Sequence, residues 1–335
     1  MKSKKIFFLS LLFSLVITAA VAFFLPFSTI VPTTSKTEAL VFSQGSTYNK
    51  EWNKVDSLTK KGLTKSALQV VEEIYTKAKS DNNAAQIVKA IIHRVKLESY
   101  MEEYSAEKSI DRLNKEIKNS KYPLTPVLHS MLAQMYWQFY ETNRWKFHNR
   151  TQTVNFKTDD INTWDLKTIT AHTIRHYQLS LQNTDSLKHT SLNIYDDIIV
   201  NDNPSEAEKK TNPTRKFRPS LYDFLAHRAV DFYISEEPGL ITPAYKFELN
   251  DENYFGDYNA FAKMKIESKD TLSLNFYAAK ILQTLLVFHS NDKSPEALID
   301  VDLKRLKFIR NKSVVQWKDS LYLQALQNME KNFLS

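Results

Sequence analysis

Two histidines four residues apart are the candidate metal ligands of this sequence. His172 and His176 would share one face of a helix, and Asp165 lies seven residues before His172 on that face. Imidazole nitrogens and a carboxylate can all bind Zn²⁺. No glutamate follows His172 in the HExxH manner of zinc proteases, and we expect no third histidine near the pair. The pattern therefore favours exposed or capping histidines over a metal site.

Pairs of adjacent acids could carry hydrolytic chemistry. They are Asp159-Asp160, Asp196-Asp197 and Glu236-Glu237. A glycosidase needs two carboxylates roughly 5–10 Å apart across a cleft. Adjacent acids diverge on a helix and favour helix N-termini, and Asp159-Asp160 stands directly before Ile161, where it predicts a helix start. A helical glycan-active enzyme would need two acids that converge near Trp137 or Trp164, and it is the least favoured alternative.

One segment of the chain is dense in aromatic residues. Its members are Tyr136, Trp137, Tyr140, Trp145 and Phe147. Rings at this spacing either form a core seam between helices or line a groove for a peptide or glycan. The pattern favours the seam, and partner binding by these five residues stays the alternative.

Glycine and cysteine counts exclude several classes of site. The chain has four glycines and no cysteine. Phosphate-binding loops and dinucleotide fingerprints need closely spaced glycines, and a nucleophile elbow needs a glycine on each side of its serine. Without cysteine there is no disulfide, zinc knuckle, iron–sulfur site or thiol nucleophile. We therefore predict a non-enzymatic protein without a cofactor.

The charge distribution argues against a nucleic-acid partner. The net charge is +7, and it falls to +4 without Lys2, Lys4 and Lys5 at the N-terminus. A remainder of +4 is an ordinary solubility charge and not a concentrated basic surface. The expected partners are proteins.

Residues 1–27 have the pattern of a signal peptide or signal anchor. Lysines precede an apolar run over 6–27, and Ala20-Val21-Ala22 offers a cleavage site between small residues. The run is also long enough to span a bilayer, so cleavage and anchoring in the membrane both remain open. Either outcome exports the remainder to the periplasm or cell envelope. Residues 28–46, rich in Ser, Thr and Pro, are expected to be a linker.

Apolar residues at three- and four-residue intervals predict a mostly α fold over 47–335, with a sub-boundary near 201–219. The stripes cover 63–78, 84–95, 110–117, 128–139, 274–288 and 298–309. Asn82-Asn83 breaks the first stripe from the second, and Thr125-Pro126 resembles an N-cap followed by proline at the first helical position. Short helices with short polar breaks are typical of tetratricopeptide-like arrays, but no clean 34-residue period is present, which predicts an irregular array. Near 238–270 we expect a long loop or small hairpin, because 245–249 and 262–266 alternate like strands. The segment 274–288 should be the most buried helix.

Four strings of the chain resemble the N-terminal region of large alpha-2-macroglobulin-like envelope proteins of Bacteroidetes. They are 136–151 (YWQFYETNRWKFHNRT), 163–167 (TWDLK), 218–228 (RPSLYDFLAHR) and 297–307 (ALIDVDLKRLK). The resemblance runs from about Tyr48 to the C-terminus.

The resemblance implies a helical scaffold that precedes the macroglobulin β-sandwich domains and a protease-capturing thioester region. A thioester needs a cysteine, and this chain has none. The chain is therefore expected to be the leading segment of such a protease-inhibitor protein, with the later domains or proteases as partners. The alternative is a free-standing tetratricopeptide-like interaction protein in the cell envelope that presents 136–147 to a peptide.

Overall fold

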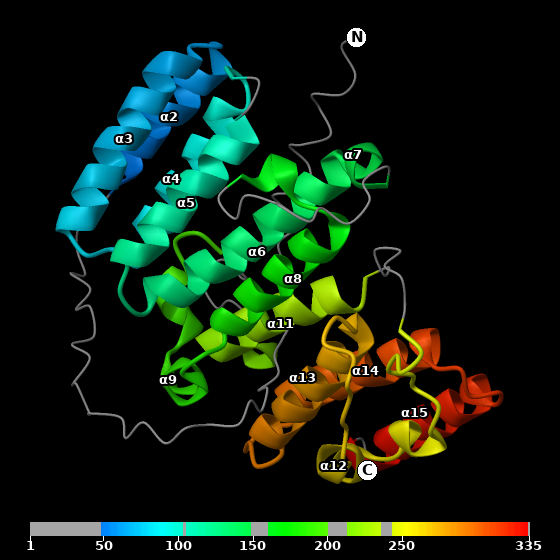
Figure 1. Ribbon diagram of the computed structural model, residues 1–335. Coiled ribbons are helices and arrows are strands. Elements are labelled where there is room, and N and C mark those ends of the chain that lie inside the picture. Colours follow the sequence, from blue (N-terminus) through cyan, green and yellow to red (C-terminus); the bar gives the residue numbers. More distant parts are fainter. Residues whose placement is uncertain (1–47, 103–104, 149–159, 200–212, 236–242, 334–335) are drawn as a thin grey trace, which may run out of the picture. The chain divides into compact units, whose positions relative to one another are not determined.

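The computed structural model describes residues 48–102, 105–148, 160–199, 213–235 and 243–333, and they fold as helices joined by turns and ordered loops (Figure 1). These residues form no β-strand, so the prediction of a mostly α fold is confirmed. The predicted leader at 1–27 and linker at 28–46 lie outside the described residues. Across the described ranges, no helix combines the length and the apolar character needed to cross a bilayer.

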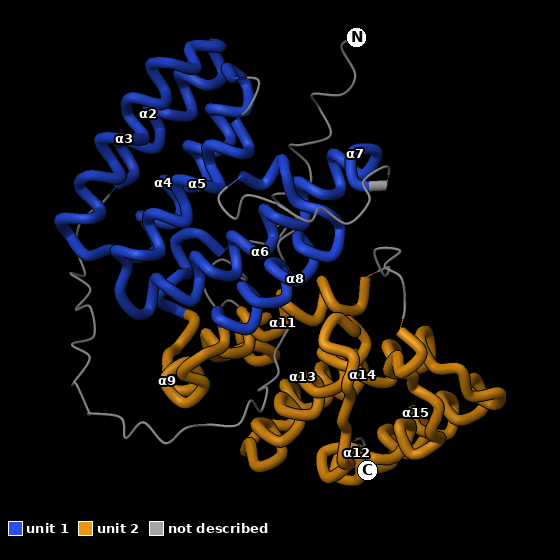
Figure 2. Tube along the Cα trace, viewed as in Figure 1, with its two compact units in different colours: residues 1–14, 24–180, 193–207 blue, residues 15–23, 181–192, 208–335 orange. Residues whose placement is uncertain are grey.

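The chain divides into two compact units (Figure 2). Unit 1 holds the described residues up to 180 and those of 193–199, and unit 2 holds 181–192 and 213–333. Most of the predicted sub-boundary at 201–219 lies outside the described residues.

Unit 1 is a succession of helices in which each packs on the next. Its α-helices are α2 (Asn49–Lys60), α3 (Thr64–Ser80), α4 (Ala84–Glu98), α5 (Ser105–Asn119), α6 (Leu124–Thr142), α7 (Arg144–His148) and α8 (Leu166–Leu179). Helix α3 packs on α2 and α4, and α6 packs on α5 and α8. Helices α2, α4 and α6 begin at residues 49, 84 and 124, at intervals of 35 and 40 residues. The unequal intervals match a sequence without a fixed period.

Left-handed residues make the first two turns of unit 1. Gly62, with a φ of +73°, ends α2, and Asn82, with a φ of +51°, ends α3. Both residue types adopt this conformation at low cost. Asn83 then caps α4, because its side chain accepts a hydrogen bond from the Gln86 backbone N–H at 3.1 Å. This confirms the break expected at Asn82-Asn83.

The described part of unit 2 contains four α-helices of 13 to 17 residues and two of six residues. Its α-helices are α9 (Thr184–His189), α11 (Leu221–Tyr233), α12 (Tyr258–Lys263), α13 (Leu274–His289), α14 (Glu296–Lys312) and α15 (Lys318–Phe333). The described residues of the two units also include the 3₁₀ turns η1 (Ile161–Thr163), η2 (Leu192–Tyr195), η3 (Pro213–Phe217) and η4 (Glu252–Phe255). Helix α13 packs on α11 and α14, and it buries 11 of its 16 residues. Helix α11 buries 11 of 13, so α11 and not α13 is the most completely buried helix.

A buried polar network fixes the start of α11. Ser220 and Asp223 form a reciprocal capping box, and the other Asp223 oxygen lies 2.7 Å from Nε2 of His289. Nδ1 of His289 lies 2.6 Å from Asp292. Burial alone would lower the pKa of His289, but the two carboxylates outweigh it and raise that pKa. The network therefore joins α11 to the end of α13 through the imidazole of His289.

The long loop expected near 238–270 is present in the described residues and contains η4 and α12, while its alternative, a small hairpin, is not formed there. The segments at 245–249 and 262–266 form no strands: the first begins in a turn, and the second begins in the last turn of α12. Phe247 contacts Phe276 of α13 and Leu249 is 1% exposed, so the alternation reflects one buried face against a helix. Helix α6 begins at Leu124, not after a Thr125 cap.

Candidate functional site

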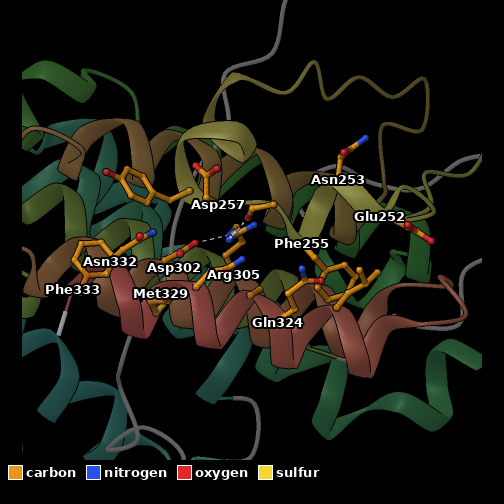
Figure 3. A pocket seen from close by; sticks show the side chains of 15 residues that line it. Glu252, Asn253, Phe255, Asp257, Asp302, Arg305, Gln324, Met329, Asn332 and Phe333 are labelled. Atoms are coloured by element: carbon orange, nitrogen blue, oxygen red, sulfur yellow. Dashed lines mark hydrogen bonds and ion pairs between the residues drawn. The ribbon is translucent and has the colours of Figure 1, made fainter. Parts of the chain in front are cut away.

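A polar cavity of about 290 Å³ lies in unit 2 between η4, the start of α12, and helices α14 and α15 (Figure 3). Its floor is Arg305 of α14, a guanidinium with no solvent exposure. Nε of Arg305 donates to Asp302 at 2.6 Å, and its two terminal nitrogens donate to the carbonyls of Tyr254 and Gly256 at 2.7 and 2.9 Å. Arg305 thus ties the loop that carries η4 to helix α14.

Asp302 faces the cavity beside Arg305 (Figure 3). The residue is 3% exposed, and only its Oδ1 is hydrogen-bonded among the described residues. Burial raises the pKa of Asp302, although the Arg305 charge acts in the opposite direction. Its second oxygen accepts no hydrogen bond from the described residues and is not one of the solvent-inaccessible unpaired atoms, so a donor in the cavity can reach it.

One wall of the cavity is a row of side-chain amides on α15. Gln324, Asn328 and Asn332 are four residues apart, and Asn253 of η4 is a further amide in the cavity lining. None of these four amides is hydrogen-bonded within the described residues. A primary amide offers two donors and an acceptor with two lone pairs. The wall can therefore bind a ligand that both donates and accepts.

Rings and charge complete the lining. The rings of Tyr258 and Phe333 are 6.1 Å apart at one end of the cavity. The charged lining residues are Glu252, Asp257 and Asp302, with Arg305 as the single cation. Because Arg305 is already paired with Asp302, the remaining field is negative and favours a cationic or hydrogen-donating ligand.

The predicted aromatic segment is mostly core. Tyr136, Tyr140 and Phe147 are 2–3% exposed, and the Tyr140 and Phe147 rings meet edge to face at 5.5 Å. Trp137 is partly exposed, while Trp145 on α7 is 67% exposed. The structure therefore leaves only the two tryptophans accessible to a partner.

The histidine pair joins this aromatic core through a third histidine. Nδ1 of His176 lies 3.0 Å from Nδ1 of His129, which is on α6. His172 stacks on Trp164 at 4.1 Å, and the Tyr136 ring lies 5.5 Å from that of His176. The expectation that no third histidine is near was wrong, because His129 is 47 residues away in the sequence and α6 packs on α8.

The three imidazoles are neutral at physiological pH. Burial, followed by the charge of Arg175, lowers the pKa of His129 to about 4, and the same two causes lower that of His172. Burial and the neighbouring imidazoles lower the pKa of His176 to about 3. Within the described residues no group of three or more His, Cys, Asp or Glu side chains could hold a metal ion.

Asp165 caps a helix. It is 8% exposed, and its Oδ1 accepts a hydrogen bond from the Thr168 backbone N–H at 2.7 Å at the start of α8. We expect Asp165→Ala to lower the free energy of unfolding by about 1 kcal/mol, and Asp165→Ser to lower it by a few tenths, because serine keeps a capping oxygen.

Urea denaturation of the two Asp165 variants measures this difference, and zinc titration supplies the control. Equal losses of stability in the two variants would contradict the capping role, whereas an equal loss of zinc affinity in both would indicate a metal ligand.

The predicted acid pairs do not form a catalytic pair in the described residues. Asp160 caps η1 and Asp197 accepts a hydrogen bond from Gln86 at 3.2 Å. Asp159, Glu236 and Glu237 lie outside the described residues. The helix start expected after Asp160 is confirmed as a 3₁₀ turn.

Sequence reasoning missed the cavity of unit 2, although signals for it were present. Asp302 and Arg305 fall on the apolar stripe of Leu298 and Val301, and charged residues in such a stripe are buried only when paired. The amides of α15 recur at a spacing of four, which places them on one helix face.

A second cavity, of about 410 Å³, lies beside α11 and α14 in unit 2 and is lined by ion pairs. Arg218 lies 3.1 Å from Asp300, and Lys304 lies 2.7 Å from Asp231. Burial lowers the pKa of Lys304 to about 8, with Asp231 acting against it. Arg218 and Lys304 are each already paired with a carboxylate. This cavity therefore has less charge available to bind a ligand than the first cavity has.

Comparison with protein-family models, curated proteins and solved structures finds no match for the chain. The resemblance to alpha-2-macroglobulin-like envelope proteins therefore rests on its four sequence strings.

Proposed function

We propose that the chain is an exported, non-enzymatic helical scaffold that binds protein partners, as the leading region of an alpha-2-macroglobulin-like protein of the cell envelope. The observation that carries the proposal is the helix succession of unit 1, in which α3 packs on α2 and α4, and α6 packs on α5 and α8. Helix arrays of this kind present extended surfaces, which proteins use to bind other proteins.

The placement of three of the four strings supports the same proposal. The string at 163–167 contains the Asp165 cap of α8, and those at 218–228 and 297–307 lie in and around the buried helices α11 and α14. Residues at such positions are restricted by packing, which suits a shared helical scaffold.

Sequencing the locus beyond the codon for Ser335 tests the proposal. We expect an open frame that continues into sequence with the alternating pattern of β-sandwich domains. We also expect the full-length protein to capture an added protease, and the helical region alone to leave protease activity unchanged. A stop codon with no macroglobulin gene nearby would contradict the macroglobulin part of the proposal.

A free-standing interaction module is the second candidate, and the exposure of Trp145 favours it. A photo-crosslinking amino acid at position 145 should give a discrete protein adduct in cells. The matched control is position 100, where Tyr100 is also an exposed ring of unit 1, at 45%. Adducts of equal yield from both positions would indicate nonspecific contact.

A further inference from the structure

We propose that the cavity between η4, α12, α14 and α15 binds an extended peptide segment and takes up one lysine or arginine side chain of that segment. This inference rests on the proposed function of the chain as a protein-binding scaffold. It names the class of partner and the site.

The spacing of the amides fits an extended backbone. Residues four apart on a helix are separated by about 6 Å along its axis. Every second residue of an extended chain is separated by about 6.6–6.8 Å, and its peptide groups on one edge repeat at that distance. The side chains of Gln324, Asn328 and Asn332 can therefore each meet one peptide group of a strand that runs along α15.

The chemistry of the amides also fits. A peptide group has one N–H donor and one C=O acceptor, and a primary amide complements both. Asn253 of η4 is a further amide in the cavity lining. Because none of the four side chains is hydrogen-bonded within the described residues, binding breaks no internal hydrogen bond.

The charge of the cavity selects a basic side chain. Glu252, Asp257 and Asp302 line it, and no lysine does. Oδ2 of Asp302 has no protein donor in the described part of the chain, although the residue is 3% exposed. An ammonium or guanidinium group would satisfy this oxygen, and a charged donor forms a stronger hydrogen bond than a neutral one.

The rings complete the fit to a long basic side chain. Lysine and arginine have apolar stems that pack on rings, while their cations are attracted to ring faces. Tyr258 and Phe333 lie beside the amide row, where they can hold such a stem.

Fluorescence anisotropy with the whole chain tests the proposal. The probe is a fluorescein-labelled peptide of about nine alternating threonine and alanine residues with a central lysine, which spans roughly 30 Å when extended. Its counterpart carries norleucine, which has a similar length and no charge, and we expect it to bind at least about tenfold more weakly.

Matched variants locate the binding. Asn328→Ala should weaken the lysine peptide at least about fivefold, because one donor–acceptor pair is lost. Gln327→Ala removes an exposed amide that does not line the cavity, and it should leave affinity unchanged. Asp257→Asn should weaken binding about tenfold while folding is kept, since asparagine can still cap α12.

Several outcomes would overturn the proposal. They are equal affinity for the lysine and norleucine peptides, no binding up to about 1 mM peptide, equal loss in Asn328→Ala and Gln327→Ala, or binding of a neutral oligosaccharide that the lysine peptide does not displace. None of these outcomes bears on the proposed scaffold function, which is tested separately by sequencing the locus beyond the codon for Ser335.

Discussion

Replacing Arg305 by methionine is expected to lower the free energy of unfolding by about 3–5 kcal/mol, because the change leaves a buried carboxylate unpaired. Asp302 loses its guanidinium partner, and the carbonyls of Tyr254 and Gly256 lose their donors. Urea denaturation followed by far-UV circular dichroism measures the loss.

An exposed ion pair in the same unit is the matched control. Arg310 lies 2.7 Å from Asp319, and both side chains are solvent-exposed. Arg310→Met should therefore lower the free energy of unfolding far less than Arg305→Met does, because solvent screens the exposed pair. Similar losses for both variants would show that the burial of Arg305 is not what makes it important.

The pH dependence of Arg305→Met separates a buried charge from a simple loss of packing. Without the guanidinium, burial and Asp257 remain, and both raise the pKa of Asp302. The folded state then binds a proton more readily than the unfolded state, so acidification from pH 7 to 5 should reduce the penalty of the substitution. The double variant Arg305→Met with Asp302→Asn should also be more stable than Arg305→Met alone at pH 7.

Helices and caps could be predicted because they depend on residues a few positions apart. The apolar stripe at 63–78 correctly predicted α3, and Asn82-Asn83 correctly predicted where α3 ends. The local pattern was not sufficient where a strand and a loop segment show the same alternation of apolar and polar residues. The loop segment with Phe247 and Leu249 alternates like a strand because Leu249 is buried and Phe247 packs on a helix.

The candidate sites could be predicted less well because distant segments build them. His129 and His176 are 47 residues apart, and only the packing of α6 on α8 brings them together. Likewise, Arg305 binds carbonyls of Tyr254 and Gly256 about 50 residues earlier. An apolar stripe that contains Asp302 and Arg305 predicts that the two charges are paired, but it does not predict what else they bind.

Acidification should destabilise unit 1 steeply. Burial lowers the pKa of His93 and of His129 to about 4, and burial with neighbouring imidazoles lowers that of His176 to about 3. Their unfolded pKa is about 6.5, so between about pH 6.5 and 4 the unfolded state binds more protons than the folded state. Stability is therefore complete above pH 6.5 and falls as the pH falls.

Each such histidine should contribute a slope of about 1.4 kcal/mol per pH unit within this window. At pH 5 this amounts to about 2 kcal/mol for one histidine, before any allowance for coupling between His129 and His176. Urea midpoints of the whole chain between pH 7.5 and 5 measure the slope.

Removing one titrating ring tests the origin of the slope. His176→Asn should lower the number of protons taken up on unfolding by about one, because asparagine does not titrate. The free energy of unfolding should then depend less steeply on pH. His189→Gln removes an exposed imidazole of unit 2 and should leave the slope unchanged. Burial around α6 and α8 is the cause only if the two variants differ. An unchanged slope in His176→Asn would mean that acid acts on the chain through other groups.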